Sequence, residues 1–209
     1  MKIMNKTIAA VSVSVAGTLA IAPTTALAVP TVIDFDGLST GTDVGAAFAG
    51  LGVTFDNATV STNFNLLGSS GSNGISGTAG GFNVVQEDPI SAIFSMAVST
   101  VSVTGVDIGA DGFILSAFDA VSGGSLLDTV SVTGSSDSGF GEFFNLTVSG
   151  ADILRVEFSQ ISNDQGFADG SLYDTFIFDT AVAAVPLPAG LPLLLAGLGG
   201  LGVLRRRKG

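Results

Sequence analysis

The segment "GFILSAFDAVSGGSLLDTVSVTG", residues 112–134, carries the clearest folding signal in this chain of 209 residues. Two runs rich in Val, Ile, Leu, Phe and Ser flank the sequence Ser-Gly-Gly-Ser at 122–125. β-Branched and aromatic residues favour strands, and adjacent glycines accept the backbone angles of a tight turn. The segment therefore predicts a β-hairpin whose turn lies at residues 122–125.

The remainder of residues 31–180 continues this pattern of short apolar runs separated by Gly, Ser, Asn and Asp. Alternation with a period of two places Ile33 and Phe35 on one strand face, and Val53 and Phe55 on another. The stretch "FFNLTVSGADILRVEFSQ" (143–160) predicts a second strand pair that turns at 149–150, and "SLYDTFIFDT" (171–180) predicts the last strand. Eight to ten strands of this kind indicate an all-β fold, an antiparallel β-sandwich with a core rich in Phe.

Two segments of the body do not have a strand pattern. Residues 40–50, "TGTDVGAAFAG", predict a short helix. Residues 67–81, "LGSSGSNGISGTAGG", place Gly at every third position from 68 to 80 but contain no Pro, unlike collagen. We therefore expect a flexible exposed loop there.

The composition excludes several classes of function. The chain has no Cys and no His, which removes disulfides, thiol catalysis and the commonest metal ligand and general base. Residues 29–184 hold one basic residue against eighteen acids, a net charge of −17. Such a surface repels phosphate backbones, so nucleic acid is excluded as a partner. The three glutamates, Glu87, Glu142 and Glu157, lie in no context that marks a glycosidase cleft, and we expect no enzymatic activity.

The first 28 residues read as a secretory signal peptide. Two lysines precede an apolar stretch, and Ala26 and Ala28 form the small-residue site that signal peptidase requires. We expect cleavage after Ala28, which leaves Val29 at the mature N-terminus. The alternative is an uncleaved anchor helix.

The C-terminus combines three features in order. Residues 181–188 form a linker that ends in prolines, residues 189–204 are apolar and uncharged, and residues 205–209 are a basic tail. The apolar segment spans about 24 Å as a helix, short of the ~30 Å hydrocarbon core, so it predicts a marginal transmembrane anchor in the inner membrane. The basic residues of the tail stop translocation and stay in the cytoplasm; they are Arg205, Arg206, Arg207 and Lys208.

This arrangement resembles the VPLPA-CTERM sorting signal, a variant of the PEP-CTERM tail of Gram-negative bacteria. The resemblance rests on the motif Val185, Pro186, Leu187, Pro188 and Ala189, followed by the apolar segment and the basic tail. It implies that an exosortase, a membrane-embedded transpeptidase-like enzyme, cleaves near the motif and delivers the protein to the outer surface or the extracellular matrix. The alternative is a plain tail anchor with a proline-rich linker.

The body, residues 29–180, resembles the jelly-roll domains of PEP-CTERM proteins, which are similar to galactose-binding domains and carbohydrate-binding modules. The loose motifs that carry this resemblance include "IDFDGLSTGTDVGAAFAGLGVTFDNA" (33–58) and "LYDTFIFDT" (172–180). In such domains a structural calcium ion often joins the first strand to the last. The resemblance implies Asp34, Asp36, Asp43 and Asp174 as its ligands. The alternative is that Asp36 caps a turn and Asp174 is an exposed acid at a strand end.

The sequence as a whole predicts an exported, non-enzymatic β-sandwich that is structural or adhesive in a matrix or biofilm. One alternative is a carbohydrate-binding module that recognises an exopolysaccharide, although the chain has no Trp and a single Tyr, Tyr173, to form an aromatic platform. A surface protein that stays anchored without cleavage is the other.

Overall fold

The computed structural model describes residues 29–62, 67–77, 89–135, 142–161 and 171–180, all within a compact unit that spans residues 27–182. These residues form nine strands and one short 3-10 helix, and all the strand pairs are antiparallel. The elements are β1 (Pro30–Ile33), η1 (Ala49–Leu51), β2 (Val53–Asp56), β3 (Thr59–Thr62), β4 (Asn73–Ser76), β5 (Ile90–Val106), β6 (Phe113–Phe118), β7 (Leu126–Val132), β8 (Phe143–Gln160) and β9 (Leu172–Thr180).

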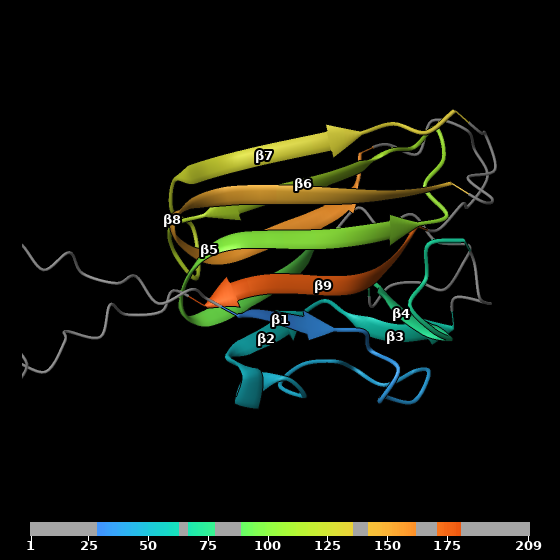
Figure 1. Ribbon diagram of the computed structural model, residues 1–209, viewed down its shortest axis with the longest axis horizontal. Helices are drawn as coiled ribbons and strands as arrows, with labels where there is room; N and C mark the ends of the chain where they lie inside the picture. Colours follow the sequence, from blue (N-terminus) through green and yellow to red (C-terminus); the bar gives the residue numbers. More distant parts are fainter. Residues whose placement is uncertain (1–28, 63–66, 78–88, 136–141, 162–170, 181–209) are drawn as a thin grey trace, which may run out of the picture. The chain divides into compact units, whose positions relative to one another are not determined.

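Two long strands fold one hydrogen-bonded sheet into a sandwich (Figure 1). The first part of β5 pairs with β2 and with the second part of β8, which in turn pairs with β6, and β6 pairs with β7. We call this the β6 layer. The second part of β5 pairs with β9 and with the first part of β8, while β9 also pairs with β1 and β4, and β4 with β3. We call this the β9 layer.

The register of β5 and β8 shows where these strands change layer. Ile93 lies opposite Arg155, and Val98 lies opposite Ile153. The chain advances five residues along β5 but only two along β8 between these pairs, so β5 carries extra, unmatched residues here. Directly afterwards β8 has the extra residues, and one of them, Asp152, has a φ of 65°. Bulges of this kind bend a strand and increase its twist, which lets both strands pass from one layer to the other.

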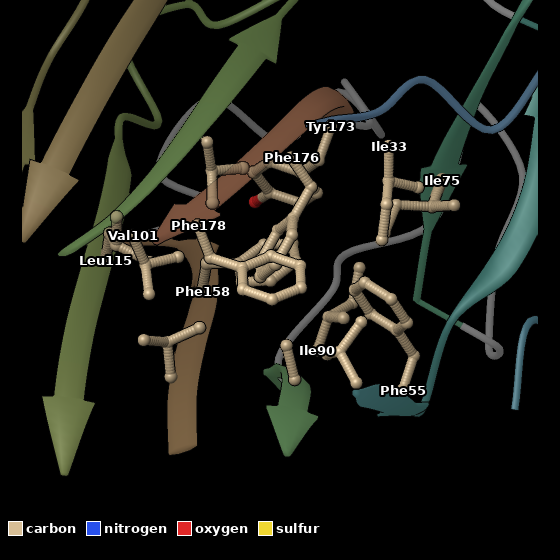
Figure 2. Packing of buried hydrophobic residues seen from close by; sticks show 14 of the residues in the cluster. Ile33, Phe55, Ile75, Ile90, Val101, Leu115, Phe158, Tyr173, Phe176 and Phe178 are labelled. Carbon is tan, nitrogen blue, oxygen red and sulfur yellow. The ribbon is translucent and has the colours of Figure 1, made fainter. Parts of the chain in front are cut away.

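The core lies between the layers and combines aliphatic side chains with a group of Phe rings (Figure 2). Phe176 of β9 occupies its centre, with ring centroids 5.2 Å from Phe55, 6.2 Å from Phe94 and 6.2 Å from Phe158. These three partners come from β2, β5 and β8, so one side chain joins four strands. Edge-to-face, tilted and stacked pairs at such distances add stability beyond that of the buried area alone.

Several of the sequence predictions are confirmed. The all-β antiparallel fold is present, and the 112–134 segment forms the predicted hairpin, with β6 and β7 paired from Phe113 opposite Val132 to Phe118 opposite Leu126. The last strand begins at Leu172, within the predicted range. The alternating pair Val53 and Phe55 is buried, as expected for one core-facing side of a strand.

Three local predictions are wrong. Residues 40–50 form turns, and the only helical residues there belong to η1, because Gly45 and Gly52 have positive φ and interrupt any regular helix. Residues 143–160 form the single strand β8 rather than a hairpin, because pairing with β5 continues on both sides of residues 149–150. Within the predicted loop at 67–81, residues 73–76 form β4, which pairs with β3 and contacts β9.

Tyr173 generates a prediction about alkaline stability, because it is the single tyrosine and is fully buried. Burial raises the pKa of its phenol far above the usual value of about 10, and the Ser171 side chain lowers this pKa by less. Below pH ~10 both the folded and unfolded states keep the proton. Above it only the unfolded state ionises, so the free energy of unfolding should fall by about 1.4 kcal/mol per pH unit.

The measurement is tyrosinate absorbance together with circular dichroism during a titration to high pH. We expect the phenol to ionise only as the protein unfolds, and Tyr173→Phe to move unfolding to higher pH. Ionisation near pH ~10 in a still-folded protein would contradict the buried position of this ring.

Candidate functional site

Asp174 is the best-anchored acid of the β9 layer. It is fully buried on β9, and its carboxylate accepts hydrogen bonds from the backbone N–H of Ser70 at 2.6 Å, the Ser70 hydroxyl at 2.8 Å and the N–H of Thr175 at 2.6 Å. The alternative that Asp174 is an exposed acid at a strand end is therefore wrong. These donors offset the desolvation of the buried carboxylate.

Asp36, in the turn after β1, binds the same segment from the other side. Its Oδ1 accepts hydrogen bonds from the N–H groups of Ser72 at 2.8 Å and Asn73 at 2.9 Å. The Asn73 side chain donates to the Leu38 carbonyl at 2.8 Å. A Cβ at Gly71 would lie 1.8 Å from Asp36 Oδ2, so only glycine permits this approach. Residues 70–73 thus join the loop after β1 to the last strand, the connection that calcium is expected to make.

The other two predicted calcium ligands make different contacts. Asp34 Oδ1 accepts a 3.3 Å hydrogen bond from the N–H of Asp36, and Asp34 is exposed. Asp43 is also exposed and forms an isolated backbone bridge with Thr59. Across the described part of the chain, no three acidic side chains gather closely enough to hold a metal ion. The calcium site stays a prediction, and backbone donors already bind Asp36 and Asp174.

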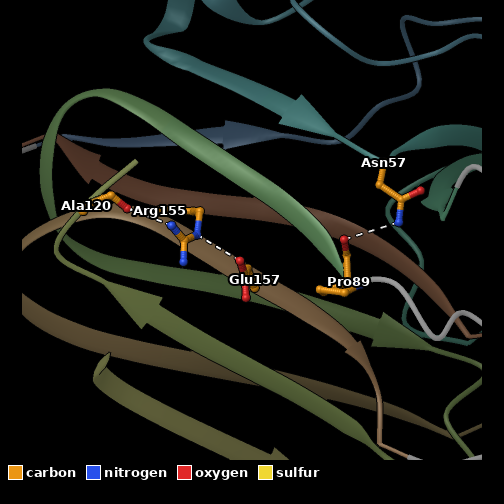
Figure 3. A network of polar contacts seen from close by, with 5 residues as sticks. All are labelled: Asn57, Pro89, Ala120, Arg155 and Glu157. Carbon is orange, nitrogen blue, oxygen red and sulfur yellow. Dashed lines mark hydrogen bonds and ion pairs between the residues drawn. The ribbon is translucent and has the colours of Figure 1, made fainter. Parts of the chain in front are cut away.

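Arg155 is the only basic residue in the described ranges, and it fixes the tip of the β6–β7 hairpin (Figure 3). Its Nε lies 2.9 Å from Glu157 Oε1, and its NH1 donates to the Ala120 carbonyl at 3.1 Å. The guanidinium carbon sits 4.3 Å from the centre of the Phe118 ring, a cation–π contact. Glu157 is thus an ion-pair partner of Arg155. Figure 3 also shows a separate contact, in which the Asn57 side chain donates to the Pro89 carbonyl at 3.3 Å.

A shallow hollow of about 140 Å3 opens beside η1, where β2 pairs with β5. Its lining is uncharged and consists of Ala49, Gly52, Val53, Thr54, Ile93, Phe94 and Ser95. The two hydroxyl groups of this lining, on Thr54 and Ser95, have no ionisable neighbour in the lining that could activate them as nucleophiles. The lining also supplies no side chain that could act as a general acid or base.

The outer face of the β9 layer presents a different set of side chains. Along the first part of β8, Phe144, Leu146 and Val148 point toward the core, since all three pack in or against it. Phe143, Asn145, Thr147 and Ser149 therefore lie on the outer face, where all four are exposed. The neighbouring β5 contributes Ser102 opposite Thr147 and Thr100 opposite Ser149. Sequence reasoning missed this face, because the adjacent Phe143 and Phe144 both read as core residues.

The remaining predicted sites cannot be placed. The signal-peptide site at Ala26 and Ala28, the linker 181–188 with its sorting motif, the apolar segment 189–204 and the basic tail 205–209 lie outside the described residues. In the portion of the chain that is described, no helix is long and apolar enough to cross a membrane.

The hydrogen bonds of Asp174 generate a prediction about stability. Asp174→Ala leaves the Ser70 and Thr175 N–H groups without their acceptor, and we expect a loss of about 2–4 kcal/mol in the free energy of unfolding. Urea unfolding monitored by Tyr173 fluorescence measures it. Asp43→Ala is the matched control, because Asp43 is exposed and we expect a change below about 0.5 kcal/mol.

Both variants should be measured in calcium and in chelator. A large loss for Asp43→Ala in calcium alone would support the calcium site and show that the hydrogen bonds of residues 70–73 are not the main connection.

Comparison with known proteins assigns this chain to no family. No family model matches the sequence, and no curated protein matches it. Solved structures that match in part include the K3 cleaved adhesin domain of Lys-gingipain from Porphyromonas gingivalis W83. It is 11% identical with a TM-score of 0.41, and the match covers 72% of this chain and 98% of that chain. CsCBM6-3 from Clostridium stercorarium, in complex with cellobiose, is 14% identical with a TM-score of 0.35. The match covers 71% of this chain and 92% of that chain. The CBM22-1–CBM22-2 tandem domain of Paenibacillus barcinonensis Xyn10C is 13% identical with a TM-score of 0.39; 80% of this chain and 50% of that chain are covered. Likeness at this level does not extend to the function of any residue.

Proposed function

We propose that this protein is an exported, non-catalytic β-sandwich that an exosortase processes at its C-terminal motif and places on the cell surface or in the extracellular matrix. The observation that carries the proposal is the pairing of the first and last strands. β1 and β9 run antiparallel, with Pro30 opposite Asp179 and Ile33 opposite Phe176. Both ends of the sandwich therefore lie side by side.

In the sequence, the two proposed cleavage positions lie before the first described strand and after the last one. Cleavage after Ala28 leaves one residue, Val29, before β1 begins at Pro30. The sorting motif begins at Val185, five residues after β9 ends at Thr180. A protease needs an extended substrate that is free of sheet pairing, and Pro186 and Pro188 each disfavour helix at the residue before them. Neither position lies within a described strand, so we expect the strand pairs of the folded body to survive both processing steps.

The side chains of the body support a binding or structural role rather than catalysis. Glu157 is paired with Arg155, and Glu142 accepts hydrogen bonds from the backbone and the hydroxyl of Ser135. These contacts hold the turns next to β6, β7 and β8 in place. The acidic surface keeps the body soluble and away from anionic partners. Signal peptidase, the exosortase and the inner membrane are the partners of this proposal, and the membrane contact is a transient anchor.

The sorting motif generates a prediction about processing. Pro186→Ala together with Pro188→Ala should let the linker become helical, so the precursor should accumulate uncleaved in the membrane fraction. Mass spectrometry of the C-terminal peptide and immunoblots of cell fractions measure this. Pro89→Ala, a proline of the body, is the control and should be processed normally.

Two results would overturn the proposal. One is a double variant that is processed and released like the wild type. The other is extracellular wild-type protein that still carries Arg207, which would show that no cleavage occurs before the basic tail.

A further inference from the structure

We propose that the outer face of the β9 layer binds a neutral polysaccharide through Phe143, Asn145, Ser102 and Thr147. These residues form one patch, since Phe143, Asn145 and Thr147 alternate along β8 and Ser102 lies opposite Thr147 on β5. The inference takes its biological setting from the proposed surface location, but the binding itself is a property of the folded body.

The polar part of the patch is a small connected network. The Ser102 hydroxyl donates to Asn145 Oδ1 at 2.5 Å and lies 3.1 Å from the Thr147 hydroxyl, which donates to it. The network fixes the rotamers of three side chains, which reduces the entropy lost when a ligand binds. Within the described residues these contacts use the oxygen of Asn145, so its amide N–H groups can donate to a ligand. Sugar hydroxyls both donate and accept, as these groups do.

The apolar part of the patch supplies an aromatic platform. Phe143 is 45% exposed, and it is the only aromatic residue among the exposed large hydrophobic side chains of the described chain. Tyr173, the ring that the sequence offers for this role, is fully buried. The loop before β4 supports the ring of Phe143, because a Cβ at Gly68 would lie 2.3 Å from Phe143 Cγ. A supported, exposed ring suits stacking against the C–H face of a sugar.

The charge of the face selects a neutral polymer. Arg155, the one basic residue in the described ranges, belongs to the other layer. Across the sheet from Thr147 the row continues through Ser102 and Ile177 to Val32, which are uncharged. Asp179 lies at the margin, and Asp174 is buried. A polyanion finds no cation here and meets a body of net charge −17, whereas a neutral polymer desolvates no charge.

A protein partner fits this face less well. Protein interfaces depend on buried Trp, Tyr and Arg anchors, and the patch presents none of these. Its hydroxyl and amide groups, with one ring and the apolar residues Val32 and Ile177, match the alternating hydroxyl and C–H surfaces of a glycan instead.

Affinity electrophoresis of the purified protein tests the inference. The gels contain dextran, xylan, hydroxyethyl cellulose or a mixed-linkage β-glucan, with alginate as the anionic comparison. We expect at least one neutral polymer to slow the wild type and alginate to leave it unaffected. Phe143→Ala should weaken the retardation constant about tenfold, and Ser102→Ala with Thr147→Val should weaken it by a similar factor.

Matched controls come from the other layer, the β6 layer with its β6–β7 hairpin. Ser116 and Thr129 are a hydroxyl pair 2.9 Å apart, so Ser116→Ala with Thr129→Val removes the same groups from a different layer. Leu126→Ala removes an exposed apolar side chain comparable with Phe143. Both controls should bind like the wild type, and urea unfolding of every variant should confirm an intact fold.

Three results would overturn the inference: retardation by none of the four neutral polymers, unchanged binding of Phe143→Ala, or equal weakening by the controls. Because the assay uses purified protein, a failure here leaves the sorting proposal standing. A failure of the proline variants in cells likewise leaves this binding result unaffected.

Discussion

The packing of β9 against the rest of the core is the interaction on which this structure depends. Phe176 and Phe178 point from β9 into the space between the layers, and Phe176 contacts rings from β2, β5 and β8. The same strand pairs with β1, β4 and β5. The last nine residues of the sandwich therefore close it in two ways, by hydrogen bonds within one layer and by aromatic contacts with the other. A chain that lacks this strand would leave a large apolar face open to water.

The second constraint is a shortage of positive charge. With one arginine in the described residues, carboxylates are stabilised by backbone N–H groups instead. Asp36 and Asp174 bind residues 70–73 in this way, Asp128 binds Ser149, and Asp119 binds Ser125. These bonds hold the segment 70–73, the turn between β6 and β7, and the neighbouring strands β7 and β8 in place. An acidic surface thus coexists with ordered loops, because the partners of the acids are dipoles of the main chain rather than lysines.

The sequence predicted those elements in which the turn residues and the strand propensity favour the same structure as the strand pairing of the folded protein. The Ser-Gly-Gly-Ser turn and the strands beside it formed as expected, because glycine conformation and strand propensity favour the same hairpin. The 149–150 turn signal failed, because pairing of β8 with β5 on both sides outweighed it and converted a turn into a bulge at Asp152. The calcium site at four acids stays a prediction, and sequence alone could not show that residues 70–73 donate hydrogen bonds to two of these acids. The exposure of Phe143 was equally hidden, since the pair Phe143–Phe144 does not reveal which ring faces the core.

The position of β9 has a mechanical consequence for a body that is held by its C-terminus. Drag on the folded body would pull along the axis of β9, which is flanked by β1 on one side and β5 on the other. Such a force shears two ladders at once, and many hydrogen bonds must break together before the strand can slide. A tether at a peripheral hairpin would instead open its bonds one after another, like a zipper. If the body is held by its C-terminus, the load therefore falls on a strand that is paired on both sides.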